Sequence, residues 1–356
     1  MKKSISQRDM ARLLGVNAST VSRALKGLPG VSTDLRQKIT ELAERQGYRP
    51  NPFAMSLRYG TTRTIGVVVP DISFSHYAHI LKSIEAEARK NGYMCIVTDS
   101  CDKYDGEAEC VQQLIDMHVE GIAVCLSQES PYRGKLGWLE NTPIPVVLFD
   151  RVADVDLPTV SINDVEAARQ ATLHLIDSGA RRIAFLGGPN CIKQAADRKH
   201  GYLEALRQRH LPIQKELVKS GHVSFNSGLS DTLELLALPQ PPDAILADHG
   251  LLSIAAFKAI VSRHLRIPQD IAIIGFMSDW VSGMSYPRIT FVKQNLNEIG
   301  RKTFKLLIDQ INGTRIHPGE MPLGTTKSGN TGTKHVVVNA RLNIRESTLP
   351  IYPDKQ

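Results

Sequence analysis

A short basic segment near the start of the chain carries side chains suited to reading DNA. Ala18 and Ser19 stand near the beginning of NASTVSRALK, and Arg23 follows one helical turn later. An arginine can bind O6 and N7 of guanine with two hydrogen bonds, and an alanine methyl can contact the methyl of thymine. On a helix that enters the major groove, we expect these three side chains to face base edges.

Two short amphipathic segments, separated by Gly15, are predicted to form the helices that position these side chains. Ser6 and Asn17 stand where the two helices would begin, and both are good N-cap residues. Apolar spacing predicts that the first helix buries Met10, Ala11, Leu13 and Leu14. In the second helix it buries Val21, Ala24 and Leu25, which leaves outside Ala18, Ser19, Ser22 and Arg23.

A third helix is predicted at about residues 33–46, after Ser32. Three short helices of this kind form a helix-turn-helix domain, whose second helix presents its N-terminal residues to the major groove. Ser6, Asn17 and Ser32, at the helix starts, are better suited to phosphate contacts.

The net charge of the chain is confined to this end. Residues 1–60 contain eleven lysines and arginines against four acids, which accounts for the whole formal net charge of +7. The remaining residues are neutral as a group. A small basic module joined to a neutral body indicates a polyanionic partner at one end, most simply double-stranded DNA.

The strings GVNASTVSRALKG, VSTDLRQKI and GYRPN resemble, in this order and spacing, the DNA-binding headpiece of the lactose/galactose repressor family. The resemblance implies that Ala18, Ser19 and Arg23 are specificity positions and that Thr20 begins the family's Thr-Val-Ser run. One departure is Leu35, where the family often has a phosphate-binding threonine. The candidate DNA-contacting residues are Ser6, Asn17, Ala18, Ser19, Thr20, Ser22, Arg23, Ser32, Asn51, Ala54 and Leu57.

Residues 50–61 are predicted to be a hinge segment. Asn51 is a suitable N-cap, Pro52 suits the first helical position, and Ala54 and Leu57 share one side of a helix barely two turns long. Because so short a helix is marginal alone, a flexible linker is expected in the free protein. The resemblance implies a hinge helix that folds on DNA and wedges Leu57 into a minor-groove step.

From residue 62 the chain alternates short apolar runs, such as TIGVVV and AILA, with amphipathic helical stretches. This alternation predicts an α/β domain of parallel sheets covered on both faces. Two such sets indicate two Rossmann-like lobes, in agreement with a resemblance to periplasmic-binding-protein-like effector domains. The predicted domains are an all-α headpiece (1–49), the hinge (50–61) and an effector-binding and dimerisation domain (62–356). Its N-lobe is predicted at about 62–162 and 292–323, and its C-lobe at about 163–291 and 324–356.

A ligand cleft is expected between the lobes. The Arg198 guanidinium can bind paired hydroxyls or a carboxylate, and the alternative is a surface salt bridge. Asp71 follows the first strand, where open α/β sheets place ligands. His76 and Tyr77 stand where the family often has aromatic residues, with plain packing as the alternative. The candidate effector-binding residues are Asp71, His76, Tyr77, Gln194, Arg198, Asp248 and Trp280.

This predicted cleft departs from the family pattern at several positions. Asp248-His249 stands where the family has Asn-Asp, and Asn163-Asp164 reverses the usual order. After Phe276, Met277-Ser278 replaces the carboxylate that typically holds a sugar hydroxyl, and Asp279 or Trp280 are candidate substitutes. A sugar or sugar derivative is the first expectation, but the family's ligand cannot simply be assigned to this chain.

Other classes of protein are not favoured. The longest apolar runs are far shorter than the roughly 20 residues of a membrane span, and the start of the chain does not resemble an export signal. Five cysteines without metal-ligand spacing indicate reduced thiols, so a cytoplasmic protein without metal or cofactor is expected. No nucleophile elbow, P-loop or dinucleotide fingerprint is present, so an enzyme is not expected.

These observations predict a cytoplasmic, nucleoid-associated DNA-binding transcription regulator, most simply a repressor. It would act as a homodimer, or a higher oligomer, on a near-palindromic operator under the control of a small-molecule effector. The sign of the effector's action is left open. The alternative is a solute-binding protein that carries a basic leader.

Overall fold

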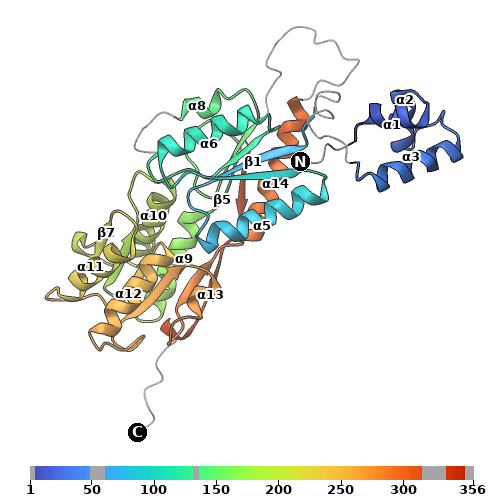
Figure 1. Cartoon of the computed structure of the whole chain (residues 1–356). Helices are drawn as coiled ribbons and strands as arrows, with labels where there is room; N and C mark the ends of the chain where they lie inside the picture. The colour runs from blue at the N-terminus through green and yellow to red at the C-terminus, as the bar shows by residue number, and fades with distance from the viewer. Residues whose placement is uncertain (1–4, 49–60, 131–135, 315–333, 349–356) are drawn as a thin grey trace. The chain divides into compact units, whose positions relative to one another are not determined.

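The structure is a computed structural model that describes residues 5–48, 61–130, 136–314 and 334–348. The chain divides into two compact units, Met1–Thr62 and Arg63–Gln356, shown in Figure 1. The predicted hinge residues Asn51, Ala54 and Leu57 lie outside the described residues.

The headpiece contains three helices, α1 (Gln7–Leu14), α2 (Ala18–Leu25) and α3 (Thr33–Arg45). Ser6 caps α1 through a reciprocal box, because its Oγ accepts from the Asp9 amide at 3.2 Å while the Asp9 carboxylate accepts from the Ser6 amide at 3.0 Å. Gly15 ends α1 in the left-handed region, with φ of 62°. Ser32 caps α3 by accepting from the Leu35 amide at 3.4 Å.

Met10, Val21 and Ile39, one from each helix, are fully buried at the centre of the headpiece. Two predictions about this core are wrong. Leu13 is 66% exposed, so the buried stripe of α1 is narrower than its apolar residues indicated. Ser22 is only 6% exposed, because Ala18, Val21, Ser22 and Leu25 form one continuous helical stripe that faces inward.

Asn17 also differs from the sequence-based prediction. It occupies the N-cap position of α2 with an extended backbone, but its side chain accepts no capping hydrogen bond. Its exposed amide is therefore not used by the helix that it precedes.

The body contains two parallel-stranded sheets. In the first sheet the strand order is β11-β5-β4-β3-β1-β2, and all of these neighbours pair in parallel. Its strands are β1 (Thr64–Val69), β2 (Met94–Asp99), β3 (Ile122–Val124), β4 (Val146–Phe149), β5 (Thr159–Ile162) and β11 (His335–Val338). The helices that cover it are α5 (Ser75–Lys90), α6 (Tyr104–Asp116), α8 (Gly137–Glu140) and α14 (Leu296–Thr314).

The second sheet has the order β12-β10-β9-β8-β6-β7, and only β12 runs antiparallel to its neighbour. Its strands are β6 (Ile183–Gly187), β7 (Val218–Ser220), β8 (Ala244–Ala247), β9 (Ala272–Phe276), β10 (Thr290–Lys293) and β12 (Arg341–Asn343). The helices of this lobe are α9 (Asp164–Asp177), α10 (Lys193–Gln208), α11 (Phe225–Leu236), α12 (Gly250–Ser262) and α13 (Asp279–Ser282), with short 3-10 turns η1 (Lys215–Leu217) and η2 (Glu346–Thr348).

Successive side chains of the central strands point to opposite faces, and each face has its own apolar core. In β1, Ile65, Val67 and Val69 pack with α5 and α14, whereas Val68 packs on the other side with α6 and α8. Both faces of a strand are buried in this way, which explains the continuous apolar run TIGVVV.

The chain passes between the lobes three times, after β5, after β10 and between β11 and β12. The third passage corrects the predicted boundary that places residues 324–356 as a whole in the C-lobe. His335–Val338 instead pairs in parallel with Thr159–Ile162 of the first sheet. A short valine run fits the edge of either sheet, so its composition does not reveal its partner strand.

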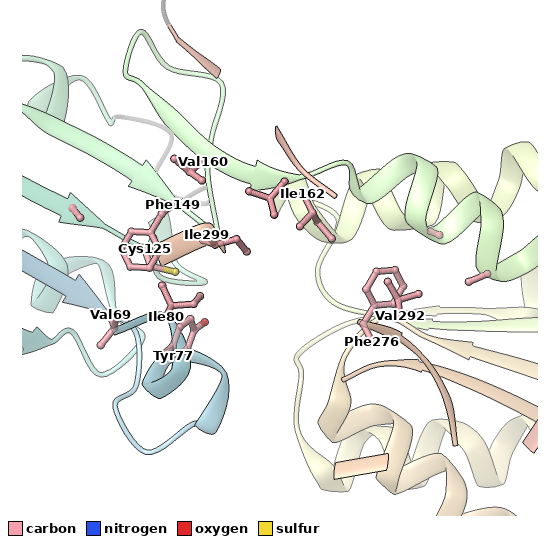
Figure 2. Packing of buried hydrophobic residues seen from close by; sticks show 14 of the residues in the cluster. Val69, Tyr77, Ile80, Cys125, Phe149, Val160, Ile162, Phe276, Val292 and Ile299 are labelled. Carbon is pink, nitrogen blue, oxygen red and sulfur yellow. The ribbon is translucent and has the colours of Figure 1, made fainter. Parts of the chain in front are cut away.

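One apolar cluster continues from the first lobe into the second. Figure 2 shows Tyr77 and Phe149 in the first lobe, Phe276 and Val292 in the second, and Ile162 on the strand that leads from one to the other. The buried apolar residues of the two lobes are therefore continuous across the junction between them.

Candidate functional site

Helix α2 presents a polar surface on the headpiece. Ser19 and Arg23 are exposed, whereas Ala18 and Thr20 are half-buried. The Ala18 side chain packs partly against the headpiece core, so only part of its methyl is available to a base. Ser22 is buried in the free headpiece and does not belong to this surface.

Helices α1 and α2 carry more basic than acidic side chains. On α3, Lys38 pairs with Asp34 at 3.0 Å and Arg45 pairs with Glu41 at 3.2 Å. Arg8, Arg12 and Arg23 are exposed on the other two helices, and the one acid there, Asp9, is used in the cap of α1. This excess of positive charge on α1 and α2 favours contact with phosphates.

The loop after α2 lies beside Arg23. Arg36 donates to the carbonyl of Leu28 at 2.6 Å and fixes this loop against α3. A Cβ on Gly30 would lie 3.4 Å from Nη1 of Arg23, and Gly30 has a left-handed φ of 93°. The guanidinium thus rests beside a backbone position that favours glycine.

In the body, Arg198 of α10 is the most constrained of the predicted effector-binding residues. It is only 3% exposed, and its Nε donates to Asp164 at 2.7 Å. Its Nη1 donates to the carbonyl of Asp248, and its guanidinium lies 4.0 Å from the centre of the Phe276 ring. Its buried Nη2 has no hydrogen-bond partner among the described residues. The predicted alternative, a surface salt bridge, is wrong because the pair is buried.

Asp248 follows β8 and turns its carboxylate toward the same place. Its Oδ2 accepts from the Gly188 amide at 2.9 Å, while its buried Oδ1 is without a partner in the part of the chain that the structure describes. Burial raises the pKa of Asp248 to about 6, although Arg198 acts in the opposite direction. Burial also raises the pKa of Asp164 to about 6 despite its bond to Arg198.

His76 and Tyr77 lie in the first turn of α5. Nε2 of His76 is 3.0 Å from Oδ1 of Asp150, and the Tyr77 ring meets the His76 ring edge-on at 5.2 Å. Tyr77 is buried in the apolar cluster, so most of its ring is used for packing.

The other predicted effector-binding residues are less buried than Arg198 and Asp248. Asp71 is half-buried and accepts from the Ser73 amide at 2.8 Å, and Gln194 is half-buried in the first turn of α10. Trp280 is 66% exposed. Asp279 pairs with Arg345 at 3.2 Å, so it does not replace the carboxylate that the sequence lacks at Met277-Ser278.

Sequence reasoning missed a polar group at the carboxyl ends of β2 and β4. Arg151 donates to Asp102 at 2.7 Å, and Asp150 accepts from His76. Asp102 and Asp150 both have left-handed backbones, with φ of 56° and 59°, which is strain that proteins concentrate at functional sites. The position rule that selected Asp71 would also have selected Asp150, at the end of PVVLFD.

The two lobes bring these groups within electrostatic range of one another. Asp150 interacts with His76 and Arg151 of its own lobe and with Arg198 of the other. Burial raises the pKa of Asp150, but its partners outweigh this and the net shift is downward. Burial lowers the pKa of His249 to about 3, so this imidazole is neutral. We call the set His76, Asp102, Asp150, Arg151, Asp164, Arg198, Asp248 and His249 the junction cluster.

The junction cluster can bind a polar molecule, because it combines buried donors and acceptors that have spare hydrogen-bonding capacity. Within the described ranges, no group of three or more His, Cys, Asp or Glu side chains is arranged to hold a metal ion. No helix in these ranges is long and apolar enough to span a bilayer.

Two family models match the chain. Residues 7–51 match the model of bacterial regulatory proteins of the lacI family. Residues 62–331 match the model of periplasmic binding proteins and the sugar-binding domain of the LacI family. The first match covers the headpiece and the second covers most of the body.

Curated relatives are similar to this chain along most of its length. The HTH-type transcriptional repressor CytR of Escherichia coli (strain K12) is 29% identical over 314 residues, which cover 88% of this chain and 92% of the relative. Catabolite control protein A of Priestia megaterium is 33% identical over 307 residues, which cover 85% of this chain and 92% of that protein.

Solved structures show the same fold. A complex of the transcriptional regulator CelR with cellobiose has a TM-score of 0.69 at 26% identity and covers 96% of this chain and 99% of its own. The lac repressor dimer bound to operator and an anti-inducer has a TM-score of 0.83 at 22% identity, with 98% and 100% of the two chains covered.

Proposed function

Because the chain belongs to the LacI family of bacterial regulatory proteins, and is a DNA-binding transcription repressor with a sugar-binding effector domain, we propose which of its residues perform these tasks. Ser19, near the start of α2, and Arg23, in its last turn, read bases, and the junction cluster binds the effector. The exposure of Ser19 and Arg23 on α2, whose Val21 and Ala24 are buried in the headpiece core, is the observation that carries the first assignment.

The mechanism that we propose is a shift between two arrangements of the lobes. The chain crosses the junction three times, and an effector bound at the junction cluster would favour one relative orientation of the lobes. That orientation would set the separation of the two hinge segments in a dimer and hence the affinity for the operator. Free Nη2 of Arg198 and Oδ1 of Asp248 support a role for these residues in holding the effector.

The proposal requires a homodimer, because two headpieces read the two halves of a near-palindromic operator. Exposed apolar side chains provide surface for self-association: Met94 and Val97 on the edge strand β2, and Tyr286 beside Met284 in the second lobe. The residues of the junction cluster serve binding in this proposal, and no catalytic role is assigned to them. Operator binding places the protein in the compartment that holds the chromosome, the cytoplasm.

Operator binding and its dependence on salt test the proposed function. Fluorescence anisotropy measures the affinity of full-length protein for duplex DNA that contains a near-palindromic site. This affinity should fall steeply as the salt concentration increases, because binding of the protein releases counterions from the phosphates. The absence of measurable duplex binding at low salt would refute the proposal.

Arg23→Ala separates base reading from backbone attraction. If Arg23 contacts a guanine, the variant should lose about 1–3 kcal/mol of discrimination at one operator base pair. Arg12→Ala, which removes an exposed arginine from α1, is the matched control and should weaken binding equally on every sequence. Uniform weakening by Arg23→Ala would instead assign Arg23 to a phosphate.

A further inference from the structure

Glu120 connects the amino ends of neighbouring strands in the first lobe. It stands two residues before β3, and its Oε1 accepts from the Arg63 amide at 2.8 Å. Its other oxygen, Oε2, accepts from the Tyr93 hydroxyl at 3.0 Å. Arg63 directly precedes β1, and Tyr93 directly precedes β2. One half-buried carboxylate therefore holds the residues that enter two adjacent strands.

Arg63 itself is held in an unusual conformation. Its φ of 50° lies in the left-handed region, which residues other than glycine seldom adopt. Its carbonyl accepts from the Met94 amide at 2.8 Å, and its Cζ lies 5.2 Å from the centre of the Tyr93 ring. The buried Tyr93 ring in turn meets Phe304 of α14 edge-on. Such a backbone persists only where its surroundings fix it, and here the amide, the carbonyl and the side chain are all in contact with the body.

The second lobe contains a counterpart that shows what is particular to Glu120. Asp243, directly before β8, accepts from the Arg181 amide at 2.7 Å and from the Arg182 amide at 2.9 Å, just before β6. Both carboxylates are half-buried, and β8 neighbours β6 as β3 neighbours β1. Neither Arg181 nor Arg182 has a left-handed backbone, and the chain reaches them from α9 of the same lobe. Arg63, in contrast, is the first residue of the body after the predicted hinge at residues 50–61.

We propose that Glu120 is a positioning residue for operator binding: together with Tyr93 it fixes the backbone of Arg63 and so sets the direction in which the chain leaves the body for the hinge. Two subunits whose hinges leave in a fixed direction need less ordering when their headpieces engage two half-sites. Glu120 lies at the amino ends of the strands, whereas the junction cluster lies at their carboxyl ends, so the role involves no contact with the effector. This inference rests on the proposed binding of a dimer to its operator and adds the residues through which the body acts on the hinge.

Glu120→Ala in the full-length protein tests this role with two duplexes of equal length. One is a near-palindromic duplex that the wild-type protein selects from a random-sequence pool, and the other is a scrambled version of it. Affinity for the selected duplex should fall at least about tenfold, because both subunits must then order the freed backbone on binding. Affinity for the scrambled duplex should not fall, because the charges of the headpiece are intact. Loss of a negative charge would by itself strengthen binding to both duplexes, so the expected effect has the opposite sign to that of charge.

Two further variants separate positioning from stability and from charge. Asp243→Ala is the matched control, because it removes a carboxylate that holds two amides at the start of a strand. It should lower the stability of the body in urea and leave affinity for the selected duplex unchanged. Glu120→Gln is the conservative variant. Its amide oxygen can still accept from the Arg63 amide and its NH₂ group can donate to the Tyr93 hydroxyl, so it should restore most of the affinity that Glu120→Ala loses.

The inference is overturned if a folded Glu120→Ala variant binds the selected duplex like wild type or loses equal affinity for both duplexes. It is also overturned if Asp243→Ala or Glu120→Gln loses as much as Glu120→Ala. If Glu120→Ala does not fold, Tyr93→Phe decides, since it removes only the hydroxyl that donates to Glu120. We expect a smaller loss confined to the selected duplex, and wild-type affinity in that variant would refute the role. Failure of the wild-type protein to prefer any duplex would instead refute the proposed function on which the inference rests.

Discussion

Arg198 is held by three kinds of contact, namely an ion pair with Asp164, a bond to a backbone carbonyl and the face of the Phe276 ring. Removing one partner of such a buried pair is costly, because the other partner then remains as a buried charge without water or a counter-charge to stabilise it. It also orients the guanidinium so that, among the described residues, Nη2 is left without a hydrogen-bond partner. The ion pair therefore positions the one donor that is left for a ligand.

Removing one partner of this pair should cost more than removing both. Arg198→Met is expected to destabilise the body by about 3–5 kcal/mol, because Asp164 is then buried without its cation. The double variant Arg198→Met with Asp164→Leu should recover most of that loss. Urea unfolding of the single and double variants measures the difference. Equal losses in the single and double variants would mean that the pair contributes no coupling.

Glu107, in the first turn of α6, is a second buried carboxyl with an altered pKa. Burial raises its pKa from 4.5 to about 7, although bonds from the Ser127 amide and the Ser130 hydroxyl act in the opposite direction. Between these pH values the folded protein retains a proton that the unfolded chain has released. The contribution of Glu107 to stability is therefore greatest at low pH and is lost as pH rises toward 7.

Glu107→Gln tests this dependence, because the amide does not ionise. The loss of stability between about pH 5 and 7.5 should be smaller in the variant than in wild type, by up to on the order of 3 kcal/mol. Urea unfolding at a series of pH values provides the comparison. Glu109→Gln, an exposed neighbour on the same helix, should leave the wild-type profile unchanged. Parallel profiles for wild type and Glu107→Gln would contradict the assignment.

At the scale of elements, α9 and α10 pack closely against each other at Gly201. A Cβ on Gly201 would lie 2.0 Å from the carbonyl oxygen of Val165, so the two helices approach closely only because this position is glycine. Tyr202, the next residue, donates from its hydroxyl to the Ile183 carbonyl at 2.8 Å and stacks on Phe185. Arg198 lies one turn earlier, so its position depends on this contact.

Gly201→Ala should therefore destabilise the body although alanine is the better helix former. We expect a loss of about 1–3 kcal/mol from the forced separation of the helices. Gly313→Ala is the matched control, because Gly313 lies in α14 with nothing within 4 Å of its added Cβ, and it should stabilise by up to about 1 kcal/mol. Thermal unfolding distinguishes the two, and a stabilising Gly201→Ala would rule out the steric argument.

The elements themselves were largely predictable from the sequence, because most carry their own signal. Thr64–Val69 and Ala244–Ala247 were predicted at their observed bounds, since buried parallel strands read as continuous apolar runs. The side on which Ser22 lies and the sheet that His335–Val338 joins were not predicted. Both depend on packing partners far away in the sequence, which a local pattern does not contain.

The candidate site was predictable only in part for the same reason. Arg198, His76 and Asp248 were identified, whereas Asp102, Asp150 and Arg151 were not. These three residues stand out only through features of the folded chain. Arg151 pairs with Asp102, which lies 49 positions away in the sequence, and Asp102 and Asp150 have left-handed backbones that their residue types do not predict.

At the scale of the whole molecule, self-association should depend on the exposed apolar side chains. Tyr286 is 91% exposed and Met94 is 60% exposed, and a charge placed in an apolar interface is costly. We expect Tyr286→Asp combined with Met94→Asp to shift the protein toward monomer in analytical ultracentrifugation and to weaken operator binding. Met117→Asp, at the end of α6, changes a methionine of 56% exposure and serves as the control. If the double variant stays dimeric, the dimer interface does not include Tyr286 and Met94.

The three passages between the lobes have a consequence for synthesis on the ribosome. Each sheet receives an edge strand from the last part of the described body, β11 for the first and β12 for the second. Neither lobe can be completed until residues 335–343 have left the ribosome, whereas the headpiece is contiguous in the sequence and can fold as soon as it emerges. During translation the DNA-reading unit is therefore finished long before the unit that regulates it.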